Sequence, residues 1–211
     1  MCARPRTVSD LELLQATARA MSRVGPARLT LADVAREAGV VPATLVQRFG
    51  TKRGMLLELV RLGSASEGDQ MAAIRAANAS PLAALYAVAE CWAGMAGSPE
   101  ELANHLSFLV MDLTDPEFHH YALVQARASH ASMRALLDDA VKARELNACD
   151  TERLARVVQE TIQGSLVAWA IFREGAARDW VRRDLEFLLA PYVAMKRRRR
   201  GTRRESRSRT D

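Results

Sequence analysis

Residues 29–57 read LTLADVAREAGVVPATLVQRFGTKRGMLL, and this stretch decides the fold of the chain. Its first half, 31–38, places apolar residues at the i, i+3, i+4, i+7 spacing of one buried helical face. Thr30 precedes that face as an N-cap, and Gly39 follows it where a left-handed residue closes a helix. Pro42 then opens a second short helix at its first position. Two short helices joined by a glycine-containing turn form a helix-turn-helix, a motif that lays its second helix in the major groove of DNA.

The rest of the chain also reads as helices. Only 5% of the 211 residues are aromatic, and Ala, Leu, Arg and Glu are abundant. No stretch alternates apolar and polar residues over the length of a strand. At 80–81, 98–99 and 115–116 a serine or aspartate stands before a proline, which is typical of a helix start. We therefore predict an all-α fold of about nine helices.

Breaks in the apolar pattern predict where individual helices end or bend. Ser9 or Asp10 can cap a first helix, which Gly25 is expected to stop. The small, polar segment 64–69 is expected to thin or bend the helix that follows the helix-turn-helix. Gly175 is expected to end the long helix that precedes it.

Charge divides the chain into three segments. Residues 1–63 hold 10 basic and 5 acidic side chains, residues 64–195 hold 11 and 18, and residues 196–211 hold 9 and 2. A basic head on an acidic body is typical of a phosphate-binding domain on a scaffold that does not itself touch nucleic acid. We predict a helix-turn-helix domain at 1–62, a larger helical domain at 63–195, and a basic tail that is disordered on its own.

Several other classes of protein are disfavoured. No apolar run reaches the roughly 18 residues of a membrane span, and the N-terminus lacks a secretory apolar core, so we expect a cytoplasmic protein without a membrane partner. The three cysteines, Cys2, Cys91 and Cys149, are scattered and suggest no disulfide framework. The histidines lack metal-pair spacing, and no nucleophile–base set or phosphate loop is present. We therefore expect no metal, no cofactor and no enzymatic activity.

Residues 11–60 resemble the N-terminal domain of the tetracycline-repressor-like (TetR) family of transcriptional regulators. The resemblance implies a homodimer that binds a near-palindromic operator in double-stranded DNA and leaves it when a small, apolar effector binds the body. The stretch 164–192 also resembles the last two helices of the family, which pack against those of a second protomer. The elements that carry the N-terminal resemblance are Gly25, Thr30, Val34-Ala35, Ala38-Gly39-Val40, Thr44-Leu45, Phe49, Lys52 and Met55-Leu56.

The predicted second helix carries the residues expected to touch DNA. Gln47 and Arg48 can each make paired hydrogen bonds to base edges, Gln to adenine and Arg to guanine. A phosphate contact or a solvated charge is the alternative for Arg48. The hydroxyls of Thr30 and Thr44 and the ammonium of Lys52 suit phosphate oxygens. Pro42 and Ala43 would approach the groove with apolar atoms. The full set of predicted DNA contacts is Thr30, Pro42, Ala43, Thr44, Gln47, Arg48 and Lys52. Leu45 and Phe49 are predicted to hold this helix on the core.

The sequence departs from the family pattern at two positions of this helix. Val41 stands where the family usually has a capping serine, and loss of such a cap costs about 1 kcal/mol. Val46 stands where the family usually has a tyrosine that reaches a phosphate. Both changes are expected to weaken DNA binding without abolishing it.

The resemblance also implies a ligand site and a dimer interface in the body. Large apolar and polarisable residues of the middle helices are candidates for the ligand site, and an ordinary core position is the alternative for each. The ligand candidates are Trp92, Met95, Asn104, His105, Phe108, Met111 and Tyr121. The dimer-interface candidates are Ile162, Ser165, Leu166, Trp169, Leu185, Leu188, Leu189 and Tyr192.

Two alternatives stay open on the sequence alone. One is a small-molecule-binding scaffold of the same fold that no longer reads DNA, as the valines at 41 and 46 would allow. The other is a non-specific DNA-coating protein that binds through phosphate contacts of the tail, 196–211.

Overall fold

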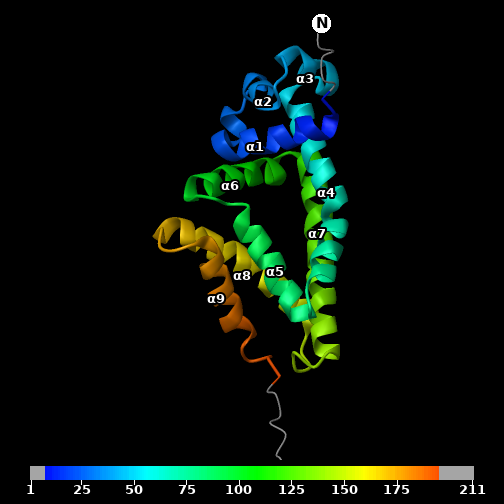
Figure 1. The fold of residues 1–211 in the computed structure, drawn as a ribbon, viewed down its shortest axis with the longest axis vertical. Coiled ribbons are helices and arrows are strands. Elements are labelled where there is room, and N and C mark those ends of the chain that lie inside the picture. The colour runs from blue at the N-terminus through cyan, green and yellow to red at the C-terminus, as the bar shows by residue number, and fades with distance from the viewer. Residues whose placement is uncertain (1–7, 195–211) are drawn as a thin grey trace, which may run out of the picture.

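The computed structural model describes residues 8–194 of the chain, and the predicted tail lies outside them. These residues form nine helices, and their only β pairing is one antiparallel bridge between Leu146 and Val193 (Figure 1), so the all-α prediction is confirmed. No helix in this part of the chain is long and apolar enough to cross a membrane. The helices are α1 (Asp10–Arg28), α2 (Leu31–Ala38), α3 (Pro42–Phe49), α4 (Lys52–Ala77), α5 (Pro81–Gly94), α6 (Pro99–Thr114), α7 (Pro116–Lys142), α8 (Thr151–Phe172) and α9 (Ala177–Leu189).

The head is built from α1, α2, α3 and the first turns of α4 around a small apolar core. Its buried side chains come from all four helices and include Leu13, Val34, Leu45 and Met55, each fully inaccessible to solvent. The caps expected from the sequence are present. Ser9, not Asp10, caps α1, and the Thr30 hydroxyl accepts a hydrogen bond from the amide of Asp33 in a reciprocal capping box, while Gly39 closes α2 in the left-handed conformation.

Two predictions about helix ends need correction. Gly25 (φ 75°, ψ 157°) does interrupt α1, but one further helical turn follows it before Leu29. The segment 64–69 lies inside α4, which continues unbroken from Lys52 to Ala77. The predicted domain boundary at 62–63 therefore lies inside one helix. Finally, α8 ends before Gly175, since Arg173 already adopts the left-handed conformation that closes it.

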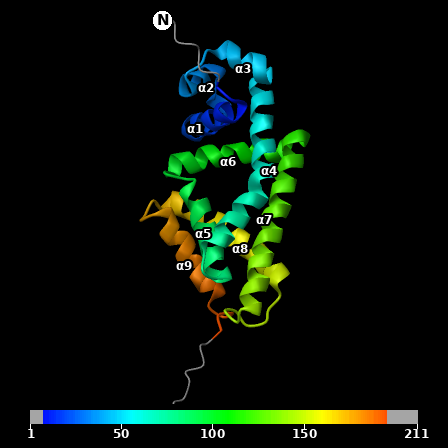
Figure 2. The ribbon, with the colours of Figure 1, turned by 45° about the vertical axis from the view of Figure 1, so that its right-hand side comes forward.

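The body packs α5, α7, α8 and α9 around a second apolar core, and α4 runs alongside α7 in both views (Figures 1 and 2). This core contains Leu85, Met133, Ile162 and Leu185, all inaccessible to solvent. Helix α6 lies across the top of the body and packs against α1 of the head. The head thus joins the body through α4, which belongs to both, and through α6.

Candidate nucleic-acid interface

Helix α3 presents one face to solvent and holds the other on the head core. Leu45 is fully buried and Phe49 is half-buried against the same core, as predicted. Because these two residues anchor the helix, the remaining side chains face outward. The outward-facing predicted contacts are Pro42, Ala43, Gln47 and Arg48, and Thr44 is half-buried beside them. The structure therefore brings five of the seven predicted DNA contacts together on one short helix.

The other two predicted contacts have intramolecular roles. The Thr30 hydroxyl donates to Oδ2 of Asp33 over 2.6 Å while it caps α2. The Lys52 ammonium donates to the carbonyl oxygens of Pro26 and Leu29, at 3.1 and 3.0 Å. These carbonyls lie at the end of α1, where unsatisfied oxygens favour a cation. Lys52 therefore fixes the end of α1 in this structure, and its phosphate contact remains a prediction.

Basic side chains in the head are paired within the protein. Each of the eight arginine and lysine side chains between residues 8 and 63 contacts a carboxylate or a backbone carbonyl. Phosphate contacts by these groups must therefore share or exchange an existing partner. The eight are Arg19, Arg23, Arg28, Arg36, Arg48, Lys52, Arg53 and Arg61.

Two carboxylates of the head show the effect of this pairing. Hydrogen bonds from Arg19 and Arg23 hold the pKa of Glu37 below its usual value. Hydrogen bonds from the hydroxyl and the backbone amide of Thr30 likewise lower the pKa of Asp33. Glu37 thereby ties α2 to α1, whereas Asp33 holds the N-terminus of α2.

The start of α3 lacks a side-chain cap, as the sequence predicts. Val41 has the extended backbone of an N-cap (φ −91°, ψ 150°), but it offers no side-chain acceptor and is 64% exposed. Six of the nine helices between residues 8 and 194 have an N-cap oxygen that accepts from the third helical amide. Helix α3 is therefore the only helix of the head without a side-chain cap.

The corner between α6 and α7 clamps the head to the body. Arg53, in the first turn of α4, pairs with Asp115 at 2.7 Å and with Glu117 at 2.7 Å. Its guanidinium also lies over the ring of Phe118, 5.5 Å from the centroid. Phe118 is fully buried and packs edge-on against Phe108, with ring centroids 5.6 Å apart. Hydrogen bonds from Arg53 lower the pKa of Asp115.

This clamp includes three of the predicted ligand residues. The Asn104 side chain donates to the carbonyl oxygen of Ser22 in α1, at 2.8 Å. Phe108 belongs to the head core, and Met111 packs against that core. These three residues thus connect α6 to the head.

The other four ligand candidates lie elsewhere. Trp92 packs against the body core, and Met95, at the end of α5, is 58% exposed. His105 is half-buried, and its burial lowers its pKa. Tyr121 is half-buried on α7, where its ring meets the edge of His120. The structure does not gather the seven candidates around one cavity.

Sequence reasoning missed an apolar stripe on α6. Leu106, Leu109, Val110 and Leu113 are between 40% and 68% exposed, and they recur at the i, i+3, i+4, i+7 spacing of a single helical face. The face that holds Asn104 and the head lies on the other side of the same helix. The spacing is visible in the sequence, but periodicity alone does not distinguish an exposed apolar face from a buried one.

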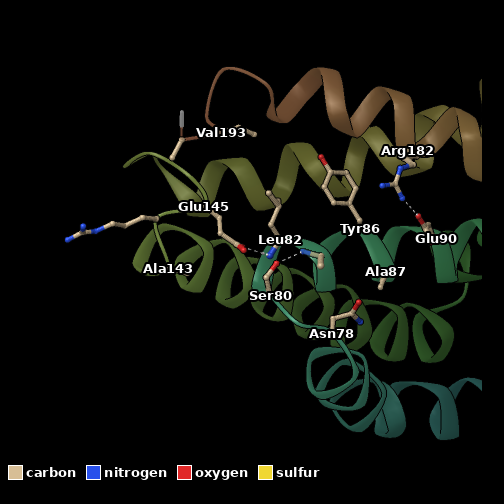
Figure 3. Close-up of a pocket in the computed structure, with 13 residues that line it drawn as sticks. Asn78, Ser80, Leu82, Tyr86, Ala87, Glu90, Ala143, Glu145, Arg182 and Val193 are labelled. Atoms are coloured by element: carbon tan, nitrogen blue, oxygen red, sulfur yellow. Dashed lines mark hydrogen bonds and ion pairs between the residues drawn. The ribbon is translucent and has the colours of Figure 1, made fainter. Parts of the chain in front are cut away.

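A groove of about 670 Å³ lies at the end of the body away from the head, between α5, α9 and the loop that joins α7 to α8 (Figure 3). Tyr86 stands in its wall, and burial is the largest cause of the raised pKa of this phenol. The Arg182 guanidinium lies 5.4 Å from the Tyr86 ring centroid and pairs with Glu90 at 2.6 Å. None of the predicted ligand residues lines this groove.

The predicted dimer residues lie mostly inside the protomer, and their contact with a second protomer stays a prediction. Six of the eight are less than 9% exposed in the protomer. Those six are Ile162, Ser165, Leu166, Trp169, Leu185 and Leu189; Leu188 and Tyr192 are half-buried at the edge of the body core. The large apolar residues that α8 and α9 expose are Val167, Ile171, Phe172 and Phe187, of which Phe187 is 84% exposed.

A shallow groove of about 720 Å³ runs between α8 and α9 next to Phe187. The Ser165 hydroxyl donates to Asp184 across it at 2.5 Å. Its lining residues are Thr161, Ser165, Asp184, Phe187, Leu188, Ala190, Pro191 and Tyr192.

These elements define an all-helical protein with a helix-turn-helix head on a larger helical body. Residues 13–59 match the profile of the family described as bacterial regulatory proteins, tetR family. No match is found among the curated proteins.

Solved structures with the same fold include several transcriptional regulators. A TetR transcription regulator from Haloarcula marismortui superposes with a TM-score of 0.70 at 17% identity, over 87% of this chain and 97% of that one. The regulator FadR from Bacillus subtilis, in complex with stearoyl-CoA, superposes with a TM-score of 0.64 at 15% identity, over 86% of this chain and 98% of that one. A putative transcriptional regulator from Saccharomonospora viridis, in complex with choline, superposes with a TM-score of 0.70 at 18% identity, over 88% of this chain and 98% of that one. The head of this chain thus matches the tetR-family profile, and the chain as a whole shares its fold with these regulators.

Proposed function

We propose that this protein is a homodimeric transcriptional repressor that binds a near-palindromic operator and leaves it when a small apolar effector binds. The observation that carries the DNA-binding part is the outward face of α3. Gln47 and Arg48 are consecutive exposed residues on a helix that the buried Leu45 fixes to the head core. Both side chains can make paired hydrogen bonds to base edges in the major groove.

Selection of bound sequences from random double-stranded DNA tests this part. We expect a palindromic site whose half-sites lie about one helical turn, or ~34 Å, apart. In the selected site, Gln47→Ala and Arg48→Ala should each relax base preference at one position per half-site. Failure to enrich any sequence would favour the scaffold alternative, which has no DNA preference. Binding without preference for any site would favour the non-specific DNA-coating alternative.

The effector part rests on the two faces of α6. One face holds α1 of the head through Asn104 and Phe108, and the other carries the exposed stripe at 106–113. A ligand that buries this stripe in one orientation of the head and not in another would shift the balance between the two. The relatives above show stearoyl-CoA and choline as ligands of this fold, and the aliphatic stripe favours an apolar effector for this chain.

The test is a thermal-shift screen of small apolar compounds, followed by operator binding with and without each hit. A hit should raise the unfolding temperature and lower operator affinity, and Leu109→Asp should abolish both effects. If the hits stabilise the protein but leave operator affinity unchanged, the effector part of the proposal is wrong and the DNA-binding part still holds.

The dimer part rests on the exposed apolar surface of α8 and α9. Ile171 and Phe187 are 73% and 84% exposed, and the groove beside Phe187 offers a place for a side chain of the second protomer. Large exposed apolar side chains on two neighbouring helices are typical of an interface between proteins. Sedimentation velocity should find a dimer for the native chain and a monomer for Phe187→Glu. Leu11→Glu, which also removes an exposed apolar side chain but lies on α1, serves as the control and should stay dimeric.

A further inference from the structure

The ion pair between Arg48 and Asp10 joins the predicted base-reading residue to a distant part of the chain. Nη1 of Arg48 lies 2.8 Å from Oδ1 of Asp10, and the two residues are 38 positions apart in sequence. Arg48 stands in the last turn of α3 and Asp10 in the first turn of α1. A cation at a helix C-terminus and an acid at a helix N-terminus are each favoured by the helix dipole. Both partners are thus placed where their charges are stabilised.

The geometry of the pair leaves part of the guanidinium available. Asp10 engages only Nη1, and the Nε and Nη2 edge makes no hydrogen bond or ion pair with residues 8–194. This edge has two parallel N–H groups, which is the arrangement that binds O6 and N7 of guanine together. The Arg48 side chain is 39% exposed, so the free edge can reach a partner outside the protein.

We propose that Asp10 is a specificity-determining positioning residue that fixes the Arg48 guanidinium so that its free edge reads guanine in the operator. The proposal rests on the DNA-binding function proposed above. An arginine on its own samples many rotamers, and ordering it on DNA weakens binding to every site. A carboxylate that holds Nη1 before DNA binds removes part of the entropic cost of ordering the side chain. Binding gains from this only at sites where the free edge finds its two acceptors. Asp10 therefore raises discrimination between bases and not affinity in general.

The position of Asp10 gives the proposal a second signature. A carboxylate close to the DNA-facing helix repels phosphates, so its removal should strengthen binding to non-specific DNA. Loss of Asp10 is thus expected to lower specific and raise non-specific binding, two changes in opposite directions. A role for Asp10 in folding alone would move both in the same direction.

The experiment uses the full chain and the operator obtained by selection. Binding is measured to that operator, to the operator with its guanine replaced by adenine at the Arg48 position, and to unrelated DNA of equal length. In the native protein we expect the replacement to weaken binding about tenfold, within the range of a bidentate contact. In Asp10→Asn, which keeps the size of the side chain, the same replacement should weaken binding by less than about threefold. Glu58→Gln removes a head carboxylate that pairs with Arg61 on α4, and it should keep the native discrimination.

A double-mutant cycle decides whether Asp10 acts through Arg48. In an Arg48→Ala background, Asp10→Asn should leave base discrimination unchanged, because the group that it positions is gone. Native discrimination in Asp10→Asn alone, or an equal loss at every base of the site, would overturn the proposal. Those outcomes differ from failure of the proposed function, in which the native protein itself would select no sequence.

Discussion

The uncapped start of α3 leads to a prediction about stability. Val41→Ser places a hydroxyl at an N-cap whose backbone is already extended, where it can accept from the amide of Thr44. Val41 is 64% exposed, so the change gives up little apolar burial. Six other helices between residues 8 and 194 show the same bond at 3.0 to 3.2 Å, so the geometry is common in this chain.

The matched control is Val41→Ala, which removes the same methyl groups without adding an acceptor. A good N-cap is worth about 1 kcal/mol over alanine, so Val41→Ser should exceed the control by about that amount. For a chain of this size that difference corresponds to an unfolding temperature higher by about 2–4 °C. Urea and thermal unfolding should be followed by circular dichroism at one fixed protein concentration, because dimerisation makes the midpoint depend on concentration. Equal midpoints for the two variants would refute the capping argument.

Three further predictions concern the contact between the head and α6–α7. Gly25→Ala should lower the unfolding temperature, because the residue has φ 75° and a Cβ there would lie 2.7 Å from Oδ1 of Asn104; a native midpoint would contradict this reading. Phe118→Ala should cost about 3–5 kcal/mol in urea unfolding, since this fully buried ring leaves a cavity; a loss below about 1 kcal/mol would mean that the corner repacks. The lowered pKa of Asp115 stabilises the fold at pH values above 3.8, the usual pKa of this group, and this contribution is lost as pH falls through the lower folded pKa. In Arg53→Ala the unfolding midpoint should therefore vary less with pH in acid, and identical pH profiles for the two proteins would argue against the pair.

Local signals in the sequence predicted the head well because they act within a few residues. The hydroxyl of Thr30, the left-handed turn at Gly39 and the proline at 42 each specify backbone geometry without help from distant contacts. The same holds for Leu45, whose burial follows from the spacing of the apolar residues around it. The core of the head was predictable for this reason.

The body was less predictable because periodicity shows that a face is covered but not by what. Leu185 and Leu189 form the expected apolar face of α9, yet that face is covered by the protomer's own core. Phe108 has the character of a ligand contact and is part of the head core. The pair of Arg48 with Asp10 spans 38 residues, and no spacing rule relates two exposed charges at such a separation. Contacts of this kind depend on the tertiary arrangement of helices.

The unbroken course of α4 has a mechanical consequence. A helix of 26 residues is about 39 Å long at 1.5 Å per residue, and its first turn is fixed in the head while its last turns pack in the body. A tilt of about 5° at the body end would therefore carry the other end through roughly 3 Å over that length. In the proposed two-fold dimer both heads would move, so the distance between the two α3 helices would change by up to about twice that amount. An angular change too small to disturb either core would thus suffice to put the two heads out of register with successive turns of the DNA.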